Sequence, residues 1–174
     1  HKIKGPQGIG ALVLRRKKYK RPPVKPLFHG GRQEYGFRPG TTAVPLVAGL
    51  SYAAELCEKE HANWLKGCIE QKEKMLNSLK DVAYKINGDQ RYCLPSIINI
   101  SFDGIDAEAV FSALKEEYAF SNGSACTSGS YEPSHVLKAM GFDDKRINSS
   151  LRISWDYESE VDWSKLVSYI KSVV

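Results

Sequence analysis

The chain has 174 residues, 42% of them hydrophobic and 26% charged, which is the composition of a globular protein and excludes a disordered or fibrous chain. No apolar run approaches the roughly 20 residues that span a bilayer, and no signal peptide opens the sequence, so we expect a cytoplasmic protein without a membrane segment. The formal net charge of +5 comes from one segment, because RRKKYKR at 15–21 holds six of the 25 basic residues.

The first forty residues combine an apolar run with basic and glycine-rich segments. GIGALVL at 8–14 is short and apolar, and predicts a buried strand. The basic run 15–21 is interpreted as a solvated loop, with a docking patch for an acidic protein or a nucleic acid as the alternative. Direct nucleic-acid binding is not expected, because no nucleic-acid signature accompanies the run. Residues 28–42 hold four glycines and predict an ordered loop whose backbone can approach a ligand closely.

A long helical region is predicted next. Apolar residues recur at intervals of three and four between 47 and 57, and again between 65 and 79. A polar break at 58–63 separates the two stretches. We therefore expect one bent helix or two helices in succession, with a domain boundary near residue 58.

The remaining sequence alternates between strand and helix patterns, which predicts an α/β assembly with few strands. Strands are expected at 82–86, 95–102 and 151–155, and helices at 107–114, after Pro133 and around 163–170. Pro133 suits the first turn of its helix, and Gly141 suits the end of it. Ser159 and Asp162 form a candidate capping pair for the last helix.

The four cysteines fall into two kinds of setting. Cys57 and Cys68 occupy apolar positions of helical segments, and Cys93 precedes a leucine, so core packing is the simplest interpretation of all three. No two cysteines have C-x-x-C spacing and the histidines have no metal-ligand spacing, so no metal site is expected. Cys126 differs, because it lies in SNGSACTSG at 121–129, among small polar residues that neither pack a core nor favour a helix.

Three stretches of the sequence carry a family resemblance: HKIKGPQGIGALVLR, HGGRQEYGFRPGT and SNGSACTSGSYEPSHVLKAMG. In this order they resemble the C-terminal half of a cysteine desulfurase of the NifS/IscS type, a pyridoxal 5′-phosphate (PLP) enzyme of the class V aminotransferase family. The third stretch is the most specific, because S-x-G-S-A-C-T-S followed by E-P-S-H-V-L marks the subgroup with a long cysteine loop. The resemblance extends to LRIS near the end of the chain.

The resemblance implies roles for five residues. Lys2 would hold PLP covalently through its amine, and His1 would contact the cofactor phosphate. Thr41 would reach the phosphate of the PLP in a neighbouring subunit, which implies a homodimer. Cys126 would take the sulfur of L-cysteine as a persulfide, and Arg152 would bind the substrate carboxylate through two parallel hydrogen bonds.

Each of these positions also has a plain structural interpretation. Lys2 alone is a surface lysine, Cys126 an incidental thiol, and Arg152 a strand residue paired at the surface. Thr41 is also explained as the N-cap of the following helix, and a helix N-terminus attracts phosphate as well. The sequence departs from the family pattern where Arg32 replaces a glycine, and where Trp155-Asp156 follows Ser154 in place of S-x-G.

The implied fold is the C-terminal portion of a PLP-dependent transferase fold. Residues 1–57 would complete the large PLP-binding domain. Residues 58–174 would form an α+β small domain, built on a short, largely antiparallel sheet and carrying a mobile cysteine loop at about 119–132. Because the N-terminal half of such an enzyme is not in this sequence, we expect residues 1–174 alone to bind little PLP and to show no turnover.

The implied activity is conversion of L-cysteine to L-alanine, with delivery of the persulfide sulfur to an acceptor protein such as an iron–sulfur scaffold or a thiolation carrier. Two alternatives remain open. One is another class V PLP enzyme, either an aminotransferase or a selenocysteine lyase. The other is a non-enzymatic docking or sulfur-carrier module. The sequence does not identify the sulfur acceptor.

Overall fold

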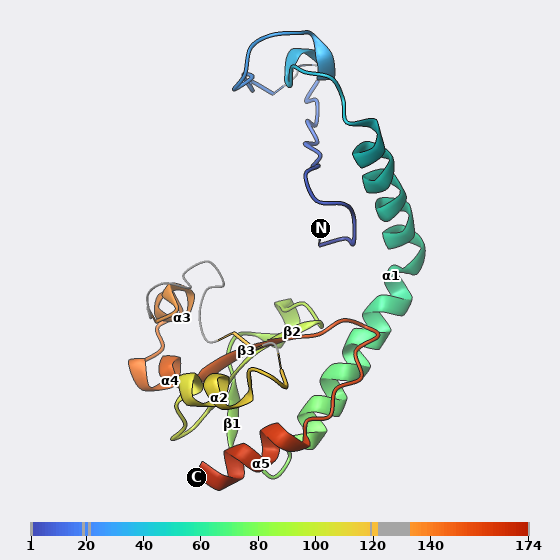
Figure 1. Cartoon of the computed structure of the whole chain (residues 1–174). Coiled ribbons are helices and arrows are strands. Elements are labelled where there is room, and N and C mark those ends of the chain that lie inside the picture. Colours follow the sequence, from blue (N-terminus) through green and yellow to red (C-terminus); the bar gives the residue numbers. More distant parts are fainter. Residues whose placement is uncertain (1, 19, 21, 119, 122–132, 174) are drawn as a thin grey trace. The chain divides into compact units, whose positions relative to one another are not determined.

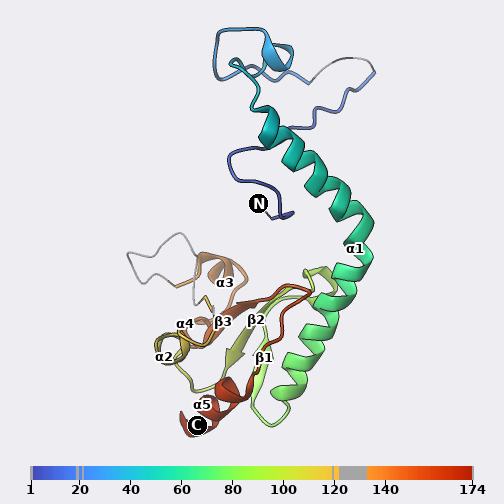
Figure 2. The same ribbon diagram turned by 45° about the vertical axis from the view of Figure 1, so that its right-hand side comes forward.

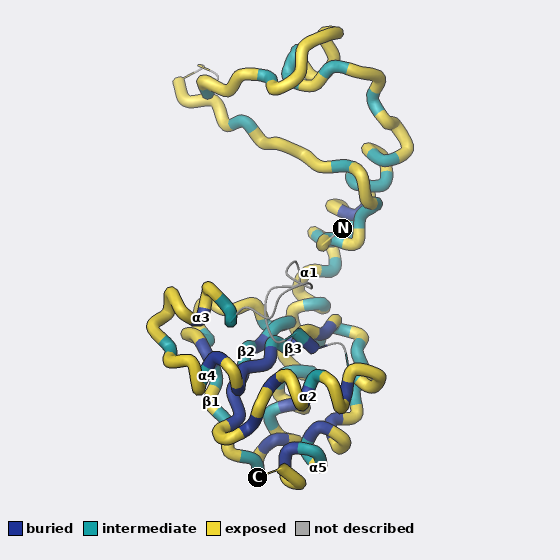
Figure 3. Tube along the Cα trace, turned by 60° about the vertical axis from the view of Figure 1, so that its left-hand side comes forward, coloured by how far each residue is buried: buried dark blue, intermediate teal, exposed yellow. Residues whose placement is uncertain are grey.

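The computed structural model describes residues 2–18, 20, 22–118, 120–121 and 133–173, and every structural statement below concerns these residues. The chain divides into two compact units, His1–His61 and Ala62–Val174. Buried residues concentrate in the second unit, whereas most of the first is exposed, with Ala53 as the buried hydrophobic residue described there (Figure 3). The interpretation of these units as a cofactor domain and a small domain stays a prediction.

The N-terminal unit contains little regular structure before its helix. A 3-10 helix, η1, covers Gln33–Gly36, and the long helix α1 covers Val44–Ser78. The predicted strand at 8–14 is wrong, because these residues have no strand assignment, and Leu12 and Val13 are 74% and 89% exposed. An apolar run becomes a strand only where a neighbouring strand takes up its backbone hydrogen bonds, and the described residues of this unit supply none.

Helix α1 continues without interruption through the polar stretch where a bend or a break was predicted. Glu, Lys, His and Ala at 58–62 all tolerate helical backbone, and an exposed ion pair between Lys59 and Glu55, 2.7 Å apart, links successive turns. The boundary between the two units falls inside this helix, after His61. The helix therefore belongs in part to each unit.

The C-terminal unit is built on a three-stranded antiparallel sheet (Figures 1 and 2). Its strands are β1, Tyr84–Ile86, β2, Ile97–Phe102, and β3, Ser150–Ser154, in the order β1-β2-β3. Ile100 pairs with Ile86 on one side and with Leu151 on the other. The predicted short, antiparallel sheet is confirmed, and all three strands lie within or beside the predicted ranges.

Three helices cover one face of this sheet and form the core with it. They are the C-terminal part of α1, α2 at Ala107–Leu114 and α5 at Ser164–Val173. The helices contribute Met75, Leu79, Val110, Leu166 and Ile170, and the strands contribute Ile98, Ile100, Phe102, Leu151 and Ile153, all at most 2% exposed. The alternation in β2 and β3 sends these apolar side chains to the helices and leaves the polar ones on the opposite face.

Short helices and their ends account for the remaining differences from the sequence predictions. The sequence did not predict α4, Asp144–Asn148, nor η2, Gln90–Tyr92. Helix α3 covers His135–Ala139 with Ser134 as its N-cap, so Pro133 precedes the cap and does not sit in the first turn. Gly141 closes this segment as expected, at φ +82°, where a glycine is favoured.

The predicted capping pair of α5 does not form. The carboxylate of Asp162 accepts the backbone N–H of Ser164 at 2.9 Å, which lowers the pKa of Asp162 below its ordinary value. The hydroxyl of Ser159 instead accepts the backbone N–H of Asp156 at 2.9 Å. Ser159 lies too far before the helix start at Ser164 to cap it, so Asp162 alone takes that role.

Candidate functional site

Two of the predicted cofactor residues lie among the described residues of the N-terminal unit. Lys2 sits in a turn and is exposed, and Thr41 is exposed three residues before α1 begins. His1, predicted to contact the cofactor phosphate, lies outside the described residues. Lys2 and Thr41 belong to the N-terminal unit, and Arg152 belongs to the C-terminal unit.

Two side chains organise the loop that presents Thr41. The guanidinium of Arg38 donates to the carbonyl oxygens of Gly40 and Thr41, at 3.2 and 3.3 Å. The amide oxygen of Gln33 accepts the backbone N–H of Gly40 at 3.2 Å. Gly40 adopts φ +99°, a left-handed conformation that few other residues adopt. The Arg38-Pro39-Gly40-Thr41 turn is thus held by the side chains of Arg38 and Gln33, and Thr41 remains exposed.

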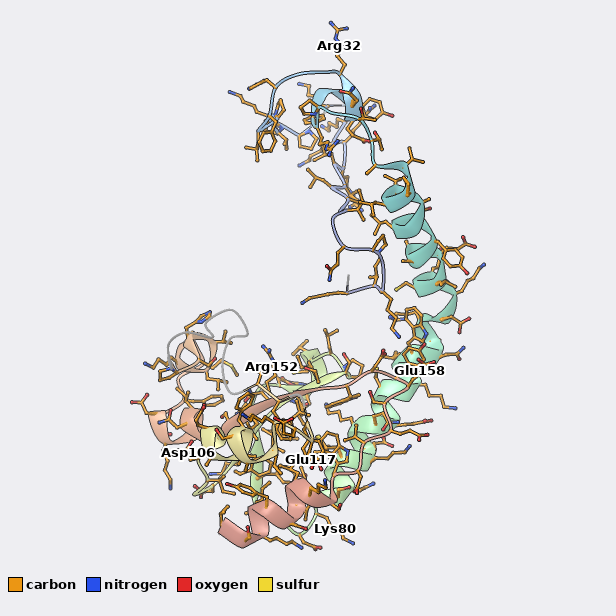
Figure 4. The ribbon with its side chains drawn as sticks, in the orientation of Figure 1. Arg32, Lys80, Asp106, Glu117, Arg152 and Glu158 are labelled. Atoms are coloured by element: carbon orange, nitrogen blue, oxygen red, sulfur yellow. The ribbon has the colours of Figure 1, made fainter. Side chains whose placement is uncertain are left out.

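Gly31, just before this loop, leaves space for the Gln33 side chain that accepts the Gly40 N–H. A Cβ on Gly31 would collide with the side-chain amide of Gln33, which is bonded to Gly40. Arg32, named above as a departure from the family pattern, adopts φ −91° and ψ 15°, at negative φ, where no glycine is required. Its side chain extends away from the loop (Figure 4). The arginine is therefore tolerated without strain at its own position.

These groups fit the chemistry of PLP, which presents an aldehyde and a phosphate monoester. Lys2 offers an exposed primary amine, and Thr41 offers a hydroxyl next to the N-terminus of a 35-residue helix, where phosphate is favoured. A separate cavity of about 790 Å³ lies in the same unit, with Arg16, Arg38 and Thr42 in its lining. Lys2 and Thr41 do not line that cavity, and we assign it no role.

Arg152 lies in β3 on the polar face of the sheet. Its neighbours Leu151 and Ile153 are buried on the helix side, while Arg152 is half-buried on the opposite side, away from α5 (Figure 4). Among the described residues its guanidinium makes no ion pair. The described residues of this sheet face carry no carboxylate either: Lys85, Ile97, Asn99, Ser101, Ser150, Arg152 and Ser154. The face is therefore suited to an anion.

The backbone of Arg152 also holds the start of the segment that contains Cys126. The Arg152 N–H donates to the Ser121 carbonyl at 2.7 Å, and the Ser121 N–H donates to the Arg152 carbonyl at 3.0 Å. Phe120, just before, is 8% exposed and stacks on Tyr118, which stacks in turn on Trp163. Cys126 itself lies outside the described residues, but the residues that lead into its segment are anchored in the core and on the sheet edge.

A polar network that sequence reasoning missed lies beside Arg152. Asn87, 4% exposed, donates through Nδ2 to the Asn99 side-chain oxygen at 2.6 Å and to the Ser150 hydroxyl at 3.0 Å. Its own side-chain oxygen accepts from Arg146 Nε at 2.7 Å. The sequence does indicate this network in one way, because the polar residues Asn99 and Ser150 interrupt apolar strands. It does not show which residues face them across the sheet.

Arg146 is the fixed cation of this network. Its guanidinium lies over the ring of Phe142, with 4.1 Å from Cζ to the ring centroid, and also donates to the Ile86 carbonyl at 3.3 Å. The Ser150 hydroxyl donates to the Arg146 carbonyl at 2.6 Å. Helix α4 thereby anchors the network from one end, and the orientation of the Asn87 amide follows from it.

Replacing Asn87 with alanine is expected to destabilise the C-terminal unit by about 2–4 kcal/mol, because the Asn99 side-chain oxygen and the Arg146 Nε–H each lose the partner that they have in this network. Urea unfolding of the chain measures this change. Asn77→Ala is the matched control, since Asn77 is exposed on α1, and it should change the free energy of unfolding by less than about 0.5 kcal/mol. A loss below about 1 kcal/mol for Asn87→Ala would show that the network contributes little.

The three described cysteines lie in different settings. Cys68 is buried in the core as predicted, Cys57 is half-buried, and Cys93 is exposed, so core packing is wrong for Cys93. Within the ranges that the structure describes, no group of three His, Cys, Asp or Glu side chains is arranged to hold a metal ion. No helix among those residues is long and apolar enough to cross a membrane.

Comparisons with known proteins agree with the sequence motifs. The family model described as aminotransferase class-V matches residues 1–162. The protein named cysteine desulfurase IscS of Mannheimia succiniciproducens is 39% identical over 178 residues, covering 100% of this chain and 43% of that protein. The IscS of Proteus mirabilis is 40% identical over 94% of this chain and 41% of its own length. The chain thus spans less than half the length of these curated relatives.

Solved structures show the same relationship. The crystal structure of DndA from Streptomyces lividans matches with a TM-score of 0.71 and 39% identity, over 89% of this chain and 44% of that one. The NifS-like protein from Rickettsia africae matches with a TM-score of 0.66 and 26% identity, over 86% of this chain and 39% of that one. The predicted fold, part of the transferase fold of these proteins, is confirmed.

Proposed function

Because the chain belongs to the class V aminotransferase family, we propose that its native protein is a PLP-dependent cysteine desulfurase. The protein takes the sulfur of L-cysteine onto Cys126, releases L-alanine, and passes the sulfur to an acceptor protein. Identity near 40% over nearly the whole chain to proteins named cysteine desulfurase IscS supports this choice within the family.

The proposed reaction gives each predicted site residue one role. Bound PLP supplies the electron sink that loosens the bond between carbon and sulfur in the substrate. The Lys2 amine holds the cofactor and moves protons at the substrate α-carbon, and the Arg152 guanidinium binds the α-carboxylate. The Cys126 thiolate attacks the substrate sulfur, so that L-cysteine and the Cys126 thiol become L-alanine and a Cys126 persulfide.

The observation that carries the proposal is the paired backbone of Ser121 and Arg152. Two hydrogen bonds, at 2.7 and 3.0 Å, join the residue proposed to bind the substrate carboxylate to the residue that begins SNGSACTSG. A thiol that must attack a carboxylate-bearing substrate needs its segment to start near the carboxylate-binding group. The absence of a competing carboxylate among the described residues of this sheet face supports the same role for Arg152.

The proposal also assigns the residues that contact the cofactor phosphate, and the oligomeric state. His1 contacts the phosphate of the PLP held by Lys2, while Thr41 reaches the phosphate of the PLP held by a neighbouring subunit. The active protein is therefore a homodimer with shared sites. The fixed, exposed Thr41 turn supports this assignment.

The test uses the native gene product with PLP and L-cysteine. Alanine release is measured together with the mass of the peptide that contains Cys126, which should gain one sulfur atom. Release of alanine without sulfur on Cys126 would point to another class V lyase. Transamination of alanine or another amino acid without sulfur release would point to an aminotransferase. Residues 1–174 alone, expected to release little alanine, serve as the comparison.

A further inference from the structure

Four residues form one row across the sheet of the C-terminal unit. Arg152 in β3 pairs with Asn99 in β2 on one side and with Ser121 on the other. Asn87, next to the end of β1, donates its backbone N–H to the Asn99 carbonyl at 2.8 Å. Residues directly opposite each other in antiparallel strands share a face, so the row Asn87–Asn99–Arg152–Ser121 lies on the polar face.

The pairing places the side chains of Asn99 and Arg152 at close range. Because Arg152 exchanges both of its backbone hydrogen bonds with Ser121, it is not hydrogen-bonded to Asn99 through the backbone. Non-hydrogen-bonded pairs are the closer kind, with Cα atoms about 4.5 Å apart and side chains in reach of each other. Both residues are half-buried.

The orientation of the Asn99 amide follows from the network behind it. Arg146 Nε can only donate, so the Asn87 atom it meets at 2.7 Å is the oxygen, and Asn87 Nδ2 must then face Asn99. Asn99 therefore turns its oxygen toward Asn87, on the β1 side. Its Nδ2 group, with two donor hydrogens, is left on the side of Arg152.

We propose that Asn99 is a second donor for the carboxylate that Arg152 binds, held in the donating orientation by Asn87 and Arg146. This inference rests on the proposed role of Arg152. A carboxylate has about four acceptor sites, and a guanidinium fork occupies two, so an adjacent N–H donor satisfies a further one. An aspartate at position 99 would keep the oxygen that Asn87 contacts but would replace the donor with a competing negative charge next to Arg152.

The half-buried Arg146 guanidinium supports the two uncharged amides of the row, Asn87 and Asn99. Arg146 ends at Asn87 and Ile86 and does not reach the Arg152 pair through any described contact. It fixes which end of each amide points where, while the charge that meets the substrate is that of Arg152. Asn99 thus acts on substrate affinity and contributes no charge of its own.

The experiment compares L-cysteine with L-cysteinamide, which lacks the carboxylate charge, in the native protein with PLP. Asn99→Asp should lower kcat/KM for L-cysteine about 10- to 100-fold, mainly through KM, and change that for L-cysteinamide less than about 3-fold. Arg152→Ala should act in the same direction. Ser154→Ala is the matched control, because Ser154 lies on the same face of β3 as Arg152. It should leave the ratio of kcat/KM for L-cysteine to kcat/KM for L-cysteinamide unchanged.

The ratio of the two kcat/KM values does not depend on the fraction of folded enzyme, so a destabilised variant still answers the question. Competitive inhibition by L-alanine against L-alaninamide repeats the comparison without turnover of the analogue. If the ratio is unchanged in Asn99→Asp but lowered in Arg152→Ala, the donor role of Asn99 is overturned and the proposed role of Arg152 stands. Equal losses for both substrates in Asn99→Asp also overturn it. An unchanged ratio in both variants overturns the proposed role of Arg152 as well.

Discussion

Replacing Cys126 with serine is expected to abolish sulfur transfer while leaving cofactor binding intact. A cysteine thiol ionises near neutral pH and its thiolate attacks sulfur readily, whereas a serine hydroxyl does neither. The loss in alanine formation from L-cysteine should be at least about 1,000-fold, on the scale of losing the nucleophile of a covalent mechanism. Alanine release and the persulfide mass of the Cys126 peptide are the two measurements.

Cys93→Ser is the matched control for that variant. Cys93 is an exposed cysteine in the same unit, and its thiol donates to the Asp89 carbonyl at 3.2 Å. It should retain full activity, because nothing in the proposed reaction uses it. If Cys126→Ser still released alanine at more than about a tenth of the normal rate, the thiol would not be the sulfur acceptor, and a class V lyase without a persulfide would fit better.

Replacing Lys2 with alanine is expected to remove the covalent attachment of PLP and at least about 1,000-fold of the turnover. The amine is both the group that holds the cofactor and the group that carries protons at the substrate α-carbon in the proposed reaction. Borohydride reduction of the native protein with PLP should fix the cofactor mass on the peptide that contains Lys2, and this mass should be absent in the variant.

Lys25→Ala tests whether that effect is specific. Lys25 is another exposed lysine of the N-terminal unit, and its loss should change neither the cofactor mass nor the turnover. Recovery of the reduced cofactor on a different lysine in Lys2→Ala, together with retained turnover, would remove Lys2 from the site. It would not affect the role proposed for Cys126.

The elements of the C-terminal unit were predictable because their signals are local. The alternation around Ile98 and Ile100 and the spacing of Val110 and Leu114 each report a face that the rest of the unit covers. The run at 8–14 gives an equally clear local signal but becomes no strand, because a strand also needs a partner. The sequence pattern reports which side chains are apolar, and says nothing about whether a neighbouring strand exists.

The site residues also differ in whether the sequence carries a local signal for them. Cys126, Lys2 and Arg152 were identified through motifs, which depend on the order of residues along the chain. Asn99 and Arg146 were not identified, because their importance lies in contacts across the sheet and from α4, 47 positions apart in sequence. Such cross-sheet partners become visible only once the register of the strands is known.

The paired backbones of Ser121 and Arg152 also set a tether length for sulfur delivery. Cys126 lies five positions after Ser121, and an extended chain spans at most about 3.6 Å per residue, so the Cys126 backbone cannot travel more than about 18 Å from its anchor on β3. Both the site that loads the sulfur and the atom that receives it must lie within that radius plus the length of the Cys126 side chain. An acceptor protein must therefore bring its receiving atom to this edge of the sheet, because the tether prevents Cys126 from moving farther from β3.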